Sequence, residues 1–326
     1  MQKTRTFFKS NQIIMFIALA TFIVFPLVAS EYLVHIMVTT LMFAYLGTCW
    51  NIIGGYAGQP AFGHTIFFGI GAYIPAILVV NYDLVPWISM FVAAFLSLVI
   101  SLIIGYLSFR YHLKGLFYGL TTLAFAQIFY YFSLNFFPGK AAGIMLPLAG
   151  DSWKYFQFTS RVPYYYIILA FLLIILLVSH LIKRSKLGLY LMAIKEDEDA
   201  AAALGIDVTR NKLIATGISC FFTAFAGVFY TQYLTFVNPE TSFRFVILID
   251  ILLGPIVGGL GTLFGPLVGS VVLSVVDEVA LYFFSQFRGV NIIASGIILI
   301  LVILFMPKGL VPKFSLLKQK LFPKNN

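Results

Sequence analysis

Long apolar runs recur along almost the whole of this chain, and they restrict it to one class of fold. Hydrophobic residues make up 61% of the 326 positions and charged residues only 10%, which is too little polar surface to cover a soluble globule. A helix of about 20 apolar residues crosses the hydrocarbon core of a bilayer, and no alternating strand pattern competes with these runs. The sequence therefore predicts an all-α, polytopic membrane protein with a single transmembrane domain over residues 1–326.

We expect about ten apolar segments, some of them broken or re-entrant because they are too short to cross the bilayer alone. They cover residues 13–29, 33–53, 66–80, 87–109, 116–134, 164–182, 213–236, 245–257, 263–281 and 290–306. An even number of spans places both termini on one side of the membrane.

The basic residues indicate which side that is, because Lys and Arg accumulate in cytoplasmic loops. With the N-terminus inside, five of the 21 basic residues fall outside and the remaining 16 inside. The five are Lys140, Lys154, Arg161, Arg244 and Arg288. We therefore expect a multi-pass protein of the cell (inner) membrane with both termini in the cytoplasm.

The net charge of +9 is interpreted in the same way. The basic residues are dispersed over loops, which favours contact with anionic membrane lipid over nucleic-acid binding. Cys49 and Cys220 both lie in apolar segments and predict neither a disulfide nor a metal site.

Glycine is concentrated in two patches that interrupt the apolar segments, residues 54–71 and residues 254–269. Interruptions at corresponding places in two halves are typical of internal repeats with a pathway near their interface. Close helix packing through small residues is an equally good explanation for these glycines. On the first explanation, the candidates for lining a translocation pathway are Gly58, Gln59, Gly63, His64, Gly258, Gly259 and Gly261.

The one long charged segment, residues 183–212, is the predicted contact with a cytosolic partner. Acids from Glu196 to Asp199 favour a helix start, four alanines follow, and Gly205 suits a helix end. Such a helix has little apolar area to keep it folded on a membrane surface, so it needs the groove of a partner. A solvated connector helix is the alternative. The candidate coupling residues are Glu196, Asp197, Asp199, Ala200, Ala201 and Gly205.

Within this segment, Asp199-Ala200-Ala201 with Gly205 four residues later resembles the Glu-Ala-Ala-x-x-x-Gly signature of ABC-importer permeases, with Asp in place of Glu. Other stretches resemble, in order, the permeases of the branched-chain amino acid importer family, which includes urea and short-amide importers. These stretches are GYAGQPAFGHTIFFGIGAY (55–73), GLFYGLTTLAFAQIF (115–129), KLIATGISCFFTAFAGVFY (212–230), GGLGTLFGPLVG (258–269) and MPKGL (306–310). One departure is Leu189-Tyr190, where family members more often carry an arginine and a small residue.

This resemblance implies a transport subunit without enzymatic activity of its own. It implies a homologous second permease, two ATP-binding cassette subunits and an extracytoplasmic solute-binding protein as partners. The chain carries no G-x-x-x-x-G-K-[ST] loop, so ATP and Mg²⁺ are expected on the partner subunits and no cofactor on this chain. Branched-chain amino acids are the first expected cargo, with urea or short amides as the alternative.

Two other classes of function compete with the importer. Asp250, Asp277 and Glu278 lie in or near apolar segments, and acids there suggest a carrier driven by an ion gradient. We favour interfacial solvation for these acids, with Asp250 pairing with Arg244. An intramembrane enzyme is less favoured, because the four histidines are scattered and no H-E-x-x-H or G-x-S-x-G motif occurs.

Overall fold

The computed structural model describes residues 21–284 without a gap, together with residues 293, 296–297, 300–301, 304 and 309–313. The long helices in this part are α2 (Glu31–Asn51), α3 (His64–Tyr82), α4 (Pro86–Arg110), α5 (Leu116–Phe136), α6 (Val162–Arg184), α9 (Val208–Leu234), α11 (Phe245–Gly258) and α12 (Gly265–Phe284). Shorter elements are η1 (Ile52–Tyr56), η2 (Lys140–Ala142), α7 (Lys186–Glu196), α8 (Glu198–Ala203) and α10 (Pro239–Ser242). Strands β1 (Ile144–Met145) and β2 (Phe236–Val237) pair antiparallel, with Ile144 opposite Val237.

Seven helical segments of the described chain are long and apolar enough to cross a membrane. The protein is therefore a polytopic helical membrane protein, but the expected count of about ten is not supported. Segment 116–134 does form α5, yet its threonine, glutamine and serine side chains dilute its apolar residues and it is not one of the seven. Segment 245–257 forms α11, which reaches spanning length only together with α10. Segment 290–306 and the start of segment 13–29 lie outside the continuously described residues.

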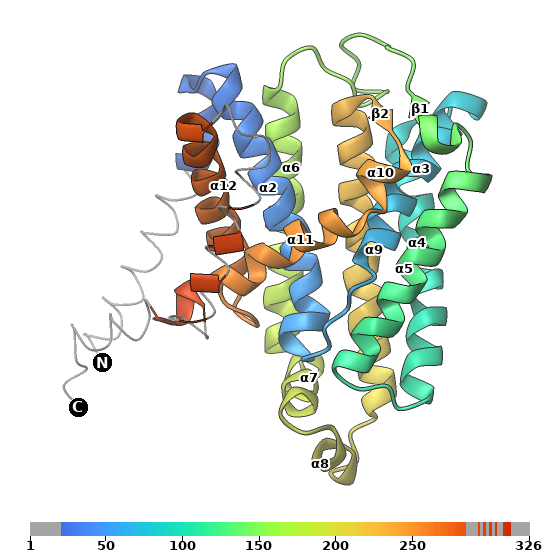
Figure 1. Ribbon diagram of the computed structural model, residues 1–326, viewed down its shortest axis with the longest axis vertical. Coiled ribbons are helices and arrows are strands. Elements are labelled where there is room, and N and C mark those ends of the chain that lie inside the picture. Colours follow the sequence, from blue (N-terminus) through green and yellow to red (C-terminus); the bar gives the residue numbers. More distant parts are fainter. Residues whose placement is uncertain are drawn as a thin grey trace, which may run out of the picture.

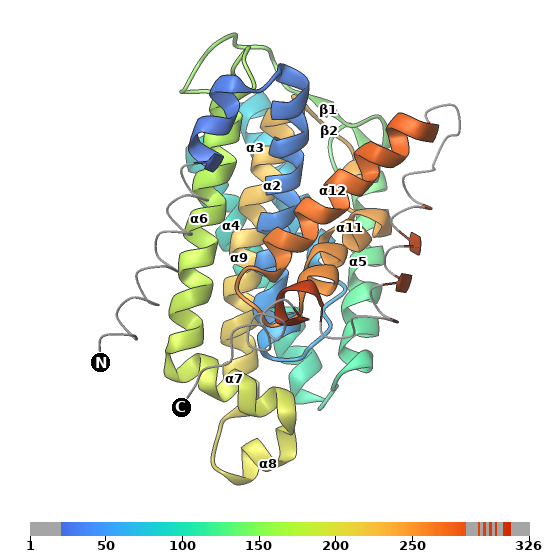
Figure 2. The ribbon, with the colours of Figure 1, turned by 90° about the vertical axis from the view of Figure 1, so that its left-hand side faces the viewer.

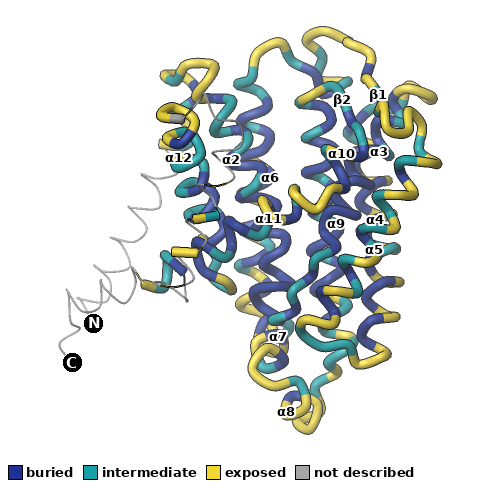
Figure 3. The backbone as a smooth tube through the Cα atoms, viewed as in Figure 1, coloured by how far each residue is buried: buried dark blue, intermediate teal, exposed yellow. Residues whose placement is uncertain are grey.

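Helix α9 forms the centre of the bundle and packs against α2, α3, α4 and α6 (Figure 1). The tube in Figure 3 is mostly dark where α2, α6 and α9 run side by side, and mostly yellow at α8. At one end of the bundle α7 and α8 project beyond the long helices (Figures 1 and 2). The loop between α4 and α5 lies at the same end (Figure 1).

Two glycines allow α3 and α9 to approach closely. A Cβ atom added at Gly227 would lie 2.1 Å from the carbonyl oxygen of Phe68, and one added at Gly71 would lie 2.0 Å from the carbonyl oxygen of Ala224. Contacts this short between a side-chain carbon and backbone oxygen are not tolerated, so the two backbones could not keep this separation. Small residues at a helix crossing are a common packing device in membrane proteins.

We expect Gly227→Ala to lower the free energy of unfolding by about 1–3 kcal/mol, because the added methyl group must push backbone apart. Gly105→Ala on α4 is the matched control: its new Cβ would lie 3.0 Å from Leu213 Cδ2, the end of a flexible side chain. That control should be neutral, or stabilising by up to about 1 kcal/mol from helix propensity. Thermal unfolding of the two purified variants measures the difference, and equal melting temperatures would contradict this account of the α3–α9 contact.

Candidate functional site

Helices α7 and α8 are the two short helices of the charged segment, and each has its own cap. The Asp197 side chain accepts hydrogen bonds from the backbone N–H groups of Asp199 (2.8 Å) and Ala200 (3.0 Å), which makes it the N-cap of α8. The acids were expected to start one helix together, and this is wrong for Glu196, which is the last residue of α7. The extended backbone of Asp197 separates the two helices.

The end of α8 is fixed by Gly205, as the sequence predicts. Its φ is +84°, a conformation that side chains with a Cβ rarely adopt. The Gly205 N–H donates to the Ala202 carbonyl (2.9 Å) and the Ile206 N–H to the Ala201 carbonyl (3.1 Å). This pair of bonds is the Schellman arrangement, which satisfies carbonyls that would otherwise be left open at the helix end.

The alanines of α8 do not all face the same way. Ala201 is only 2% exposed, so its methyl group is covered by this chain. The coupling roles of Ala200 and Ala201 stay predictions. Ala200 is exposed, and Leu204, which the sequence analysis did not single out, is 81% exposed. The outer surface of α8 therefore carries small apolar side chains beside the exposed Asp199, and Leu204 protrudes where the helix ends.

Glu198 connects α8 to the bundle and was also missed. Its Oε1 accepts a hydrogen bond from Gln59 Nε2 at 2.7 Å and forms an ion pair with Lys212 Nζ. The Lys212 side chain is 3% exposed and that of Glu198 14%, so the pair is largely removed from solvent. The sequence does indicate that Lys212 has an acidic partner, because a lysine near the start of an apolar helix requires one. The positions of the acids along the chain do not indicate which of them it is.

Two further lysines reinforce this junction. Lys195 Nζ on α7 donates to the Gly55 carbonyl at 2.9 Å. Lys114, between α4 and α5, pairs with Asp199 at 2.6 Å. The hydrogen bond from Lys114 lowers the pKa of the Asp199 carboxyl below its ordinary value, but both side chains are exposed and water screens the pair. The α7–α8 segment thus contacts the bundle at the first glycine patch, at the start of α9 and at the α4–α5 loop.

The two glycine patches meet, and Asn51 joins them. Asn51 Nδ2 donates to the Thr262 carbonyl and Oδ1 accepts from the Gly261 N–H, each at 2.9 Å. A Cβ at Gly55 would lie 2.7 Å from the Gly261 nitrogen, so this contact requires glycine. The internal repeat that the two glycine patches indicate in the sequence stays a prediction.

The candidate pathway residues are packed rather than gathered around one cavity. A Cβ at Gly258 would lie 1.7 Å from the Gly265 carbonyl oxygen, and one at Gly58 would lie 2.8 Å from Lys195 Cγ. Gln59, Gly63, His64, Gly258 and Gly259 are buried, and Gly58 and Gly261 are partly buried. For these glycines the structure favours the packing explanation, while pathway lining stays a prediction.

His64 is a buried hydrogen-bonding residue in this structure. Its Nε2 lies 2.8 Å from Ser219 Oγ, which in turn donates to the Cys49 carbonyl at 2.6 Å. Because a hydroxyl has a single hydrogen, Ser219 is the acceptor in the first contact and the Nε2 atom of His64 carries a proton. His64 and Gly63 also line a cavity of about 10 Å³, which is about the size that holds one water molecule.

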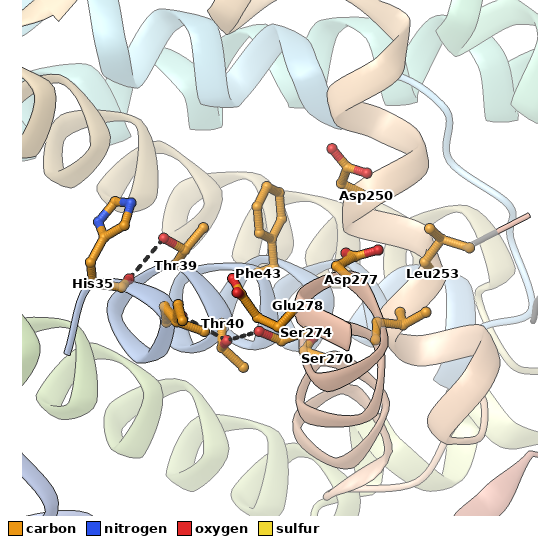
Figure 4. Close-up of a pocket in the computed structure, with 12 residues that line it drawn as sticks. His35, Thr39, Thr40, Phe43, Asp250, Leu253, Ser270, Ser274, Asp277 and Glu278 are labelled. Carbon is orange, nitrogen blue, oxygen red and sulfur yellow. Dashed lines mark hydrogen bonds between the residues drawn. The ribbon is translucent and has the colours of Figure 1, made fainter. Parts of the chain in front are cut away.

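The three acids of the apolar segments come together around a cavity of about 310 Å³ between α2, α11 and α12. Figure 4 shows Asp250, Asp277 and Glu278 together with His35 around it. The expected pairing of Asp250 with Arg244 is wrong, because Arg244 forms its ion pair with Glu240 at 2.7 Å, one helical turn away. That these acids and His35 share one cavity was not predictable from the sequence, because three separate helices supply them.

Comparison with known proteins agrees with this architecture. The family of the permease component of branched-chain amino acid transport systems matches residues 32–306. The high-affinity branched-chain amino acid transport permease LivM of Salmonella typhimurium is 29% identical over 89% of this chain and 72% of its own length. LivM of Escherichia coli is 28% identical over the same shares. The permease LivH of Salmonella typhimurium is 29% identical over 40% of this chain and 41% of its own length.

The helical membrane bundle and the family match together make this chain a transport permease. Within that class, the chain belongs to the family of permease components of branched-chain amino acid transport systems. The family match covers the described long helices except for Glu31, the first residue of α2. It supports the ATP-driven importer over the ion-driven carrier and the intramembrane enzyme.

Proposed function

We propose that this chain forms part of the translocation pathway of an ATP-driven importer for branched-chain amino acids, and that α7 and α8 are its contact with the ATP-hydrolysing subunit. The observation that carries the proposal is the form of α8: a small apolar tip faces outward at Ala200 and Leu204, while the base of the helix is tied inward through Glu198. A solvated connector needs neither a protruding leucine nor a buried ion pair.

The contacts give a route by which movement of α8 reaches the membrane-spanning helices. Glu198 accepts a hydrogen bond from Gln59, and Lys195 donates one to the Gly55 carbonyl. Both bonds connect the α7–α8 segment to the residues around η1. Asn51 at the end of α2 then contacts the turn at Gly261, which precedes α12. An alternating-access cycle requires an element that can occupy two positions, one of which the partner favours. We assign this role to the α7–α8 segment. ATP-driven closure of the partner supplies that preference.

The remaining parts of the proposal follow from the family. A homologous permease, two ATP-binding cassette subunits and an extracytoplasmic solute-binding protein complete the importer, with ATP and Mg²⁺ bound by the cassette subunits. The α7–α8 end is cytoplasmic, in keeping with Lys114, Lys195 and Lys212 at that end and with the positive-inside rule. Both termini lie on that side of the cell (inner) membrane, in keeping with the basic residues at both ends of the sequence; the seven spans are a count of the described residues alone.

Uptake into proteoliposomes that contain the complete importer tests the proposal. Radiolabelled leucine should accumulate only when ATP, the cassette subunits and the binding protein are present. Urea and a short amide, tested in parallel, distinguish the alternative cargo. Leucine uptake by vesicles with this chain alone and an imposed proton or sodium gradient would show a carrier and overturn the proposal.

A further inference from the structure

The membrane-spanning segment that contains α2 does not end as an ordinary α-helix. Residues Ile52–Tyr56, the element η1, form a π turn that continues α2 within one apolar span, Glu31–Tyr56. In a π turn each N–H group donates to the carbonyl five residues earlier instead of four, and such turns are rare and frequent at functional sites. All five residues of η1 are buried, so this winding has a cause inside the protein.

The π turn lies between attachments to two different parts of the chain. Directly before it, the buried Asn51 side chain accepts from the Gly261 N–H and donates to the Thr262 carbonyl, each at 2.9 Å. Within it, the Gly55 carbonyl accepts from Lys195 Nζ at 2.9 Å. The first attachment leads to the turn between α11 and α12, and the second leads to α7. The winding of η1 therefore sets the position of α7 relative to the α11–α12 turn.

A glycine at position 54 is what this π turn requires. A Cβ atom added at Gly54 would lie 2.3 Å from Trp50 Cη2, four residues earlier in the same segment. Trp50 is held in place, because it is 3% exposed and its Nε1 donates to the Ala61 carbonyl at 2.7 Å. In an α-helix the Cβ atoms of residues four apart are about 5–6 Å from each other and do not clash. The π winding, and not an α winding, therefore excludes a side chain here.

A π turn contains one residue more than the α turn that it replaces. The extra residue is absorbed when N–H groups pair with carbonyls four residues earlier instead of five, which turns the chain beyond η1 by about one residue, about 100°. Residues 57–63, which follow η1, have no regular secondary structure and can take up this rotation. Because π turns are rare, contacts from outside the helix have to keep this one, and Lys195 and Asn51 supply them.

We propose that η1 is the hinge of this subunit: it is wound as a π turn while Lys195 on α7 holds the Gly55 carbonyl, and it rewinds as an α turn when α7 moves away. Hinges are commonly a few residues at the end of an element that absorb a change of backbone conformation. Rewinding rotates Asn51 relative to Gly55 and so moves the α11–α12 turn. The inference rests on the proposed function, in which the cassette subunit moves α7 and α8.

Deleting Gly54 tests whether η1 holds an extra residue. The deletion leaves an α turn between Asn51 and Gly55, with the contacts of both residues in place. We expect this variant to fold with a melting temperature within about 4 °C of that of the parent chain. Deleting Val38, which is 1% exposed in the α-helical part of α2, is the control and should abolish cooperative unfolding. Equal damage by the two deletions would mean that η1 has no residue to absorb, and the hinge would be refuted.

A distance between α7 and the α11–α12 turn reports the winding in the isolated chain. Leu189 on α7 is 59% exposed and Leu260 in the turn is 44% exposed, so cysteines at these positions can carry spin labels. The native Cys49 and Cys220 are 0% exposed and give little background. Double electron–electron resonance on the doubly labelled chain in nanodiscs then gives the distribution of this distance.

Lys195→Met removes the contact that holds the Gly55 carbonyl, and we expect it to add a second, discrete distance between the two labels. In the variant that also lacks Gly54, only the parent distance should remain, because no extra residue is left to absorb. If Lys195 only tethers α7 to the bundle, its loss broadens the distribution equally with and without Gly54. That result, or an unchanged distribution in Lys195→Met, overturns the proposal.

Uptake separates this proposal from the one on which it rests. In the complete importer, the Gly54 deletion should remove ATP-dependent leucine uptake although the chain folds. Two distances in the isolated Lys195→Met chain, without ATP-driven uptake by the parent importer, would refute only the importer. Uptake by the Gly54 deletion at the rate of the parent would refute only the hinge.

Discussion

Replacing Glu198 with alanine is expected to lower the free energy of unfolding by about 3–5 kcal/mol, the range found when one partner of a buried ion pair is removed. Lys212, whose side chain is 3% exposed, would keep its charge without its counter-charge. Gln59 would lose the acceptor that its Nε2 reaches at 2.7 Å. Thermal unfolding of the purified chain in detergent or nanodiscs measures the loss, and ATP-dependent uptake should fall with it, because α8 would no longer hold the segment around Gln59.

Two comparisons make this result specific. Asp199→Ala removes an acid of the same helix whose partner Lys114 is exposed, and surface pairs contribute only about 0–1 kcal/mol. The double variant Glu198→Ala/Lys212→Met should recover much of the lost stability, because no unpaired charge then remains. A loss in Glu198→Ala no larger than in Asp199→Ala would show that the Glu198–Lys212 pair does not hold α8 to the bundle.

Leu204→Asp is expected to reduce ATP-dependent uptake at least about 30-fold without changing the melting temperature of the chain. Leu204 is 81% exposed, so the isolated subunit does not depend on it. In a docked complex, a buried anchor contributes at least about 2 kcal/mol, and about 1.4 kcal/mol corresponds to a tenfold change. Leu148→Asp is the matched control, since Leu148 is also 81% exposed but lies on the loop that follows β1.

The two neighbouring alanines should separate docking from folding. Ala200→Trp places a bulky ring on the exposed surface of α8 and should abolish uptake while the chain still inserts and unfolds normally. Ala201→Trp places the same ring at a residue that is 2% exposed, so it should destabilise the chain itself. Normal uptake by Leu204→Asp and Ala200→Trp together would mean that α8 is an ordinary connector.

The fold class followed from the sequence because hydrophobic length is a local property: each apolar run is itself the helix. The helix end at Gly205 was predictable for the same reason, since a cap concerns residues within one turn, whereas the helix start was predicted only to lie among the acids from Glu196 to Asp199. The number of spans was not, because α5 carries enough polar side chains to fall below the hydropathy of a span, and α11 reaches that length only with α10.

Contacts between distant segments were the part that the sequence could not give. Lys212 needed an acid, but whether Glu196, Asp197, Glu198 or Asp199 supplied it depended on where α7 ends and α8 begins. Asp250 was paired by proximity in sequence with Arg244, yet the structure pairs Arg244 with Glu240. The acidic cavity needs α2, α11 and α12 to meet, and nothing in the spacing of His35, Asp250 and Asp277 predicts that.

The central claim is that α8 docks into a separate ATP-hydrolysing subunit, and a photo-crosslinker at position 204 tests it most directly. In membranes that contain the whole importer, we expect crosslinks from this position to the cassette subunit, and their yield should change between the ATP-bound and nucleotide-free states. The same crosslinker at position 148 should not reach that subunit. Crosslinks from position 204 only to lipid or to this chain itself would contradict the account.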